Sequence, residues 1–77
     1  MKLGKLKDIS TGQEHMILFD PSPEVDRIWI DGKLARRIRD LENDPSVVVL
    51  GGPREDQPKG ERLFQFYRQD ILNLPDK

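Results

Sequence analysis

The sequence of 77 residues has no cysteine and a single histidine, His15. Without cysteine there is neither a disulfide nor a thiolate metal site. One histidine cannot supply the several ligands that a zinc ion needs, so we predict no metal and no cofactor. A core of this size rarely supplies more than about 3–5 kcal/mol of net stability. A homodimer or a permanent partner would therefore add useful burial.

Neither charge nor hydrophobicity is concentrated in one part of the sequence. It contains 13 Lys and Arg against 14 Asp and Glu, for a net charge of −1, and the balance holds along the chain. This balance argues against nucleic-acid binding by the surface as a whole and against an acidic surface that mimics DNA. No apolar run approaches a membrane span, and no signal-peptide pattern begins the sequence. We expect one cytoplasmic domain over residues 1–77.

The stretch from Ile28 to Leu50 predicts a strand, a helix and a second strand. Leu34, Ile38 and Leu41 are spaced i, i+4, i+7, which is typical of one face of an amphipathic helix, here over residues 33–42. Asp31 is the expected N-cap, and Asn43-Asp44-Pro45 ends the helix because proline disfavours helical geometry before it. The β-branched run Val47-Val48-Val49-Leu50 predicts a buried strand, and Gly51-Gly52-Pro53 stops it.

Short strands are expected on both sides of this unit, at residues 1–9, 14–20, 26–30 and 62–68, with the first two forming a hairpin. Residues 51–61 hold many charges, glycines and prolines and predict a mobile loop. Residues 75–77 predict a frayed tail. The predicted fold class is α+β: a mostly antiparallel sheet in the order ββ-β-α-β-β, with the helix packed on one face.

An alternative reading makes the protein all-β. Asp31-Gly32 is a dipeptide typical of a type I′ hairpin turn, which would turn residues 33–38 into a strand. The end of the chain, Phe66 to Leu74, resembles the last strand and turn of small SH3-like barrels. We favour the helix because Leu34, Ile38 and Leu41 do not alternate with period two.

Trp29, the only tryptophan, leads the functional hypothesis. If Ile28 and Ile30 face the core, Trp29 faces away beside Arg27, and an exposed tryptophan among arginines is typical of a binding hot spot. The alternative is that Trp29 packs in the core or under a covered second face. We predict a protein-binding accessory or inhibitor-like module, of the kind made by phages and mobile elements, that modulates a larger complex. The predicted protein-binding residues are Trp29, Arg27, Arg36, Arg37, Arg39 and Tyr67.

Two other binding functions are weighed against this one. The helix arginines, with Trp29 and Tyr67 as stacking platforms, could hold single-stranded nucleic acid, although acidic residues lie beside them. The amides of Gly51 and Gly52, with Arg54, could hold a small phosphate-bearing ligand. Pro53 removes a donor there, and Glu55-Asp56 adds repulsion.

We predict no enzyme and no catalytic residue. His15 has Ser10 nearby, but no nucleophile motif surrounds either residue, so His15 is interpreted as a strand histidine beside a turn. General acid–base catalysis needs a carboxyl group whose pKa is shifted by burial or by a close like charge. The paired carboxylates Glu55-Asp56 and Asp40-Glu42 are both expected to be exposed.

Overall fold

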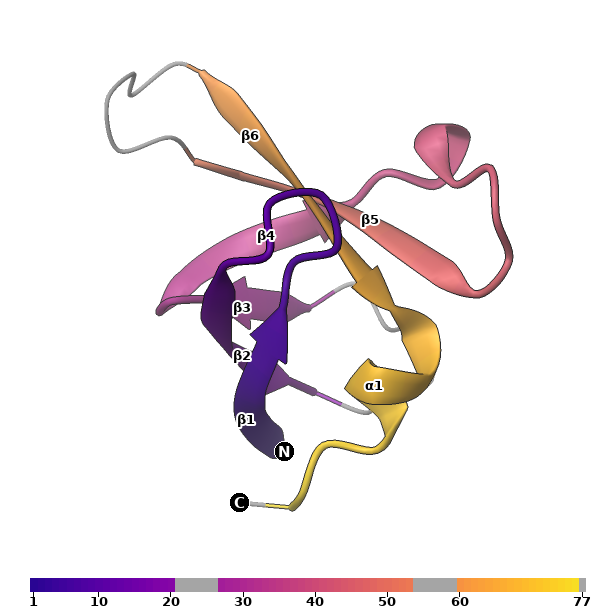
Figure 1. Ribbon diagram of the computed structural model, residues 1–77. Helices are drawn as coiled ribbons and strands as arrows, with labels where there is room; N and C mark the ends of the chain where they lie inside the picture. The colour runs from indigo at the N-terminus through magenta and orange to yellow at the C-terminus, as the bar shows by residue number, and fades with distance from the viewer. Residues whose placement is uncertain (21–26, 54–59, 77) are drawn as a thin grey trace.

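The computed structural model describes residues 1–20, 27–53 and 60–76, and these residues form a six-stranded antiparallel sheet that curls into a half-barrel (Figure 1). The strands follow one another in chain order, β1-β2-β3-β4-β5-β6. They are β1 (Lys2–Lys7), β2 (Glu14–Phe19), β3 (Ile28–Ile30), β4 (Lys33–Arg37), β5 (Val47–Pro53) and β6 (Glu61–Tyr67). A 3-10 turn, η1 (Arg39–Leu41), precedes β5, and a short helix, α1 (Arg68–Leu72), follows β6.

The predicted helix over residues 33–42 is wrong, and with it the α+β order ββ-β-α-β-β. Asp31 and Gly32 both have positive φ, 52° and 83°, as a type I′ turn requires. The turn is closed by the pair Ile30 and Lys33, so the chain returns as strand β4. In β4 the side chains alternate: Ala35 is buried, whereas Leu34 is 57% exposed.

The rest of the predicted helix is a single turn. Residues Arg39–Leu41 form η1, which buries none of its residues. Leu41, expected to face the core, is 46% exposed. Among the described residues no helix packs on a face of the sheet; the helical spacing of Leu34, Ile38 and Leu41 was coincidental. The local turn signal of Asp31-Gly32 outweighed it because both positive φ values suit those residue types.

Strand β5 runs through the two glycines instead of ending before them. Gly51 pairs with Arg36 on one side and Leu63 on the other, and Gly52 pairs with Arg62. A Cβ on Gly51 would collide with the side chains of Glu61 and Ile38. Gly51 thus lies within a strand close to two side-chain ends, which would have to shift to admit a Cβ, and not in a turn. The ends of the predicted loop over residues 51–61 lie in β5 and β6, and its middle, residues 54–59, lies outside the described residues.

The concave side of the curled sheet encloses the core, and α1 covers one end of it (Figure 1). Ile71 of α1 and Leu74 just beyond it are buried against the strands. The segment after α1 lies along β1, where the Leu3 amide donates to the Pro75 carbonyl at 3.0 Å. Asp76 forms a bridge with Lys2. Residues 75–76 of the predicted tail thus contact the edge strand β1, and residue 77 lies outside the described residues.

A buried aspartate joins the first hairpin to the last strand. Asp8 is fully buried, and its Oδ1 accepts hydrogen bonds from the amide and hydroxyl of Ser10 and from the Gln65 amide. Beside it the Ile9 amide donates to the Gln65 carbonyl at 2.8 Å. These bonds hold β6 against the β1–β2 hairpin and so fix the curl of the sheet.

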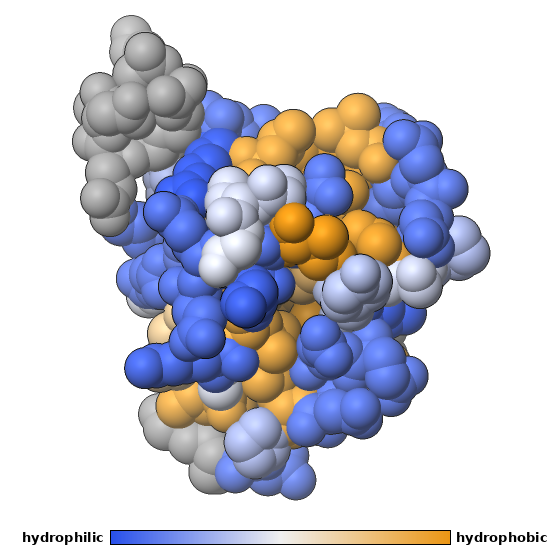
Figure 2. Space-filling view, in the orientation of Figure 1, coloured by the Kyte–Doolittle hydropathy of each residue, from blue (hydrophilic) through white to orange (hydrophobic). Residues whose placement is uncertain are grey.

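The outside of the half-barrel is mixed in character. The face in Figure 2 is mostly hydrophilic, with hydrophobic areas near its centre and upper edge. No helix in the described part of the chain is long and apolar enough to span a membrane.

Candidate functional site

A row of apolar side chains crosses the outer face of the first four strands. The registers place Leu3 opposite Leu18, Leu18 opposite Trp29, and Trp29 opposite Leu34. We call these four residues the outer row. Ile28 and Ile30 are 2% and 4% exposed, so they face the core. Trp29, which alternates with them, therefore faces outward and is partly exposed.

Positive charges flank the outer row on both sides. Continuing the β3–β4 register by one residue places Arg27 opposite Arg36. Lys5, opposite Met16, belongs to the next outward row on the other side. Arg36 donates from Nε and Nη2 to the Glu61 carboxylate at 3.1 and 3.2 Å. This pair is well exposed and contributes little to stability.

The three arginines expected on one helix face do not share a surface. The Nε and Nη2 of Arg37 donate to the Glu42 carboxylate at 2.8 and 3.0 Å; these side chains are only 17% and 11% exposed. The hydrogen bonds from Arg37 hold the pKa of Glu42 below its usual value, even though burial opposes this shift. Arg39 lies in η1. Arg37 therefore fastens the β4–β5 connection, whereas Arg36 faces outward.

Tyr67 is apart from Trp29 as well. It ends β6, opposite Val47, and is 50% exposed. The stacking pair proposed for single-stranded nucleic acid is thus divided between β3 and β6, two strands that are not neighbours in the sheet.

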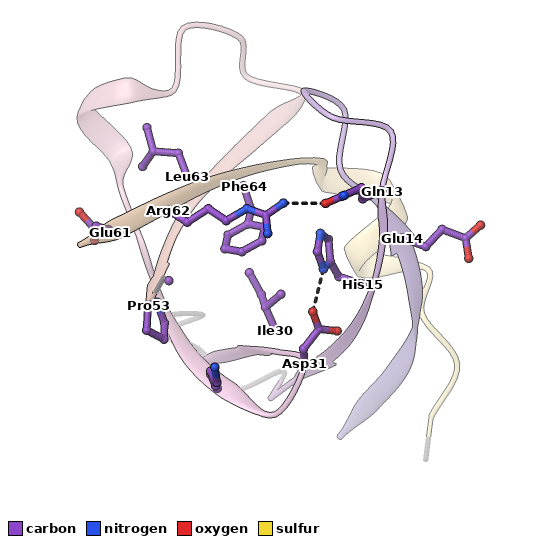
Figure 3. A pocket seen from close by; sticks show the side chains of 12 residues that line it. Gln13, Glu14, His15, Ile30, Asp31, Pro53, Glu61, Arg62, Leu63 and Phe64 are labelled. Carbon is purple, nitrogen blue, oxygen red and sulfur yellow. Dashed lines mark hydrogen bonds and ion pairs between the residues drawn. The ribbon is translucent and has the colours of Figure 1, made fainter. Parts of the chain in front are cut away.

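The end of the half-barrel that the helix α1 does not cover forms an open groove, which we call the mouth (Figure 3). Its volume is about 1050 Å³. The start of β2, the β3–β4 turn, the end of β5 and the start of β6 all contribute to it. Mouths of barrels are frequent ligand sites because they combine an apolar floor with a few polar groups.

A histidine–aspartate pair lies in the mouth. His15 is 8% exposed, and its Nδ1 lies 2.7 Å from Oδ2 of Asp31. The other oxygen, Oδ1, accepts from the Met16 amide at 2.9 Å. Burial would raise the pKa of Asp31, but the hydrogen bonds from His15 and Met16 outweigh it and lower that pKa. The second ring nitrogen, His15 Nε2, is buried and has no hydrogen-bond partner among the described residues.

An aromatic ring and a guanidinium complete the mouth. The rings of Phe64 and His15 make an edge-to-face contact, with their centroids 5.1 Å apart. The guanidinium carbon of Arg62 lies 4.8 Å from the Phe64 centroid. Its Nη2 donates to Gln13 Oε1 at 2.8 Å, so the Arg62 side chain extends across the mouth to Gln13 (Figure 3).

Sequence reasoning missed this site. The sequence predicts a strand histidine beside a turn at His15 and a helix N-cap at Asp31. The available signal was the Asp-Gly dipeptide: once it forms a hairpin turn, the β2–β3 register that pairs Ile17 with Ile30 brings Asp31 next to the start of β2.

The residues proposed to hold phosphate are placed differently. The backbone of Gly51 and Gly52 is engaged in strand pairing, and Arg54 lies outside the described residues. This placement does not favour a free amide cradle.

The predicted carboxylate pair Asp40-Glu42 also lies apart from the mouth. Glu55-Asp56 lies outside the described residues, and Glu42 is held by Arg37. No group of three or more His, Cys, Asp or Glu in the described ranges is arranged to hold a metal ion.

No protein-family model, curated protein or solved structure matches the chain.

Proposed function

We propose that this protein is a protein-binding module whose outer row docks on an acidic surface of a larger partner, as an accessory or inhibitor. The observation that supports this most directly is the alignment of Leu3, Leu18, Trp29 and Leu34 across four neighbouring strands. Leu34 alone leaves 57% of its surface exposed. A tryptophan inside an apolar patch with arginines at its edge is the typical composition of an interface hot spot.

The charges around the outer row indicate the chemistry of the partner. Arg27 and Lys5 form no ion pair with another described residue, and they lie on opposite sides of the row. A partner whose apolar contact is bordered by aspartate or glutamate would complement both sides. A second copy of this chain would bring like charges together, so the outer row does not favour the predicted homodimer.

Nucleic acid is a weaker candidate for the same surface. Arg37 is committed to Glu42 and Arg36 is offset by Glu61, which leaves few cations for phosphates. The net charge of −1 is also unlike the one-sided basic surface of most nucleic-acid binders.

The test is affinity capture by the immobilised protein after nuclease treatment, with wild type compared with Trp29→Ala and with Leu41→Ala. Leu41 is 46% exposed but lies in η1, outside the outer row, so it is a matched control. We expect one protein to be retained by wild type and Leu41→Ala and lost by Trp29→Ala. With that protein purified, Trp29→Ala should weaken binding by about 2 kcal/mol.

Two results would contradict the proposal. A partner retained equally by Trp29→Ala would remove the outer row from the interface. Retention that vanishes with nuclease would transfer the function to nucleic acid. Circular dichroism of each variant checks that folding is unchanged.

A further inference from the structure

We propose that the mouth is a recognition site for a guanidinium group, presented by an arginine side chain of another molecule, and that Arg62 occupies this site as an internal stand-in. The site is distinct from the outer row, and the proposal does not depend on that surface.

The histidine determines which kind of hydrogen bond a ligand must make. Oδ2 of Asp31 accepts a hydrogen bond from Nδ1 of His15. The proton of the neutral ring is therefore on Nδ1, and Nε2 is left as an acceptor. This acceptor is buried without a partner. A buried polar atom without a hydrogen bond is unfavourable, so the ligand that completes the mouth is a hydrogen-bond donor.

The surroundings of Nε2 favour a donor that is positively charged. The face of Phe64 attracts cations through its ring quadrupole, and Gln13 provides the acceptor Oε1. Glu14 and Glu61 also line the mouth, but their carboxylates point away from its centre (Figure 3), and that of Glu61 is paired with Arg36. Lys33 on the same rim offsets part of this charge, so shape and hydrogen bonding must add to the electrostatic attraction.

Arg62 shows that a guanidinium fits this site. Its planar group lies over Phe64 at 4.8 Å and donates to Gln13 at 2.8 Å. These are two of the three interactions available, since Nε2 of His15 still has no donor. Arginine has a long flexible stem, so Arg62 can swing outward and leave the ring to a ligand that also reaches Nε2.

The experiment uses the single histidine as the reporter. His15 is the only histidine in the sequence, so the imidazole 15N signals of the protein belong to it without further assignment. The probe is Nα-acetyl-arginine N-methylamide, and its neutral control is the citrulline analogue, which has nearly the same shape. The same titrations are run on wild type, on Arg62→Ala and on Arg68→Ala, an arginine of α1 outside the mouth that controls for loss of a positive charge.

We expect the arginine probe to shift the Nε2 signal of wild type in a saturable manner, and the citrulline probe to shift it much less. Arg62→Ala removes the competing guanidinium, so the arginine probe should bind about tenfold more tightly. Arg68→Ala should bind like wild type.

Three results would overturn the proposal. Equal binding of the citrulline probe would show that charge plays no part. Nα-acetyl-glutamate that binds wild type and is lost in Arg62→Ala would make the mouth an anion site. A flat titration of Arg62→Ala, in a variant whose amide spectrum stays folded, would show that the mouth takes no guanidinium.

Discussion

The two arginine–glutamate pairs of this protein have the same geometry but different burial, and this difference predicts the effect of removing each carboxylate. In both pairs Nε and Nη2 of an arginine donate to the two oxygens of one glutamate. The Arg37–Glu42 pair is 17% and 11% exposed, whereas the Arg36–Glu61 pair is 70% and 42% exposed. Glu42→Gln removes a carboxylate that contacts Arg37 in a largely desolvated place, whereas Glu61→Gln removes one that contacts Arg36 in water.

We expect Glu42→Gln to lower the free energy of unfolding by about 2–3 kcal/mol, somewhat under the cost of breaking a fully buried pair. Glu61→Gln should cost less than about 1 kcal/mol. Urea unfolding at neutral pH, followed by Trp29 fluorescence, measures both values. Equal losses in the two variants would refute the reasoning, because they would show that burial does not set the strength of these pairs.

The pH dependence gives a second check on the same pair. The pKa of Glu42 is lowered in the folded protein, chiefly by the hydrogen bonds from Arg37. Its contribution to stability is therefore complete above the unfolded pKa of about 4.3 and is lost as the pH falls through the lower folded value. The stability difference between wild type and Glu42→Gln should shrink as the pH falls below about 4. A constant difference would mean that the variant loses packing rather than charge.

Three further predictions concern the β3–β4 turn, the contact between β6 and the β1–β2 hairpin, and self-association. Gly32→Ala should cost about 1–2 kcal/mol, because φ of 83° is unfavourable for alanine although no atom lies near the new Cβ; a thermal melt that matches wild type would argue against the type I′ turn. Asp8→Ala should lower the free energy of unfolding by about 3 kcal/mol, because three donors lose a buried acceptor. Amide hydrogen exchange at Gln65 should accelerate. Exchange at the wild-type rate would show that Asp8 does not hold β6 against the β1–β2 hairpin. Sedimentation velocity should show a monomer, and a dimer that Trp29→Ala dissociates would assign the outer row to self-association instead of an acidic partner.

Strands could be predicted where the pattern of apolar residues shows which face of the strand is buried. The residues of β2 and β6 alternate between apolar core positions and outward positions, and both strands fall within about a residue of the predicted ranges. The sequence left two positions open for Trp29, and burial of the two isoleucines beside it decides for the outward one. Period-two alternation identifies such strands because successive side chains point to opposite faces.

The error at residues 33–42 shows where local patterns fail. The spacing of Leu34, Ile38 and Leu41 fits a helix, yet Leu34 and Leu41 are exposed. An exposed apolar residue contributes to a helical periodicity as strongly as a buried one. Of the two exposed leucines, Leu34 belongs to the outer row. The turn dipeptide Asp31-Gly32 was the better guide because it specifies backbone geometry directly.

The histidine–aspartate pair could not be found by any local pattern, because it depends on the turn and on the pairing of two strands together. A helix at residues 33–42 would have directed the Asp31 carboxylate at the amides of its own first turn. In the type I′ turn the same carboxylate reaches back across β3 to the Met16 amide and to His15. The β3–β4 hairpin thus holds Asp31 at the mouth and Trp29 and Leu34 in the outer row.

This shared hairpin makes Asp31→Asn an informative variant. Asparagine tolerates positive φ, so the turn and the outer row should persist. The amide group can still accept from one donor but no longer fixes the His15 proton by charge, so affinity of the mouth for the arginine probe should fall. Capture of a partner through Trp29 should be unchanged. Loss of both activities, with the fold intact by amide spectra, would mean that the two surfaces form one continuous interface.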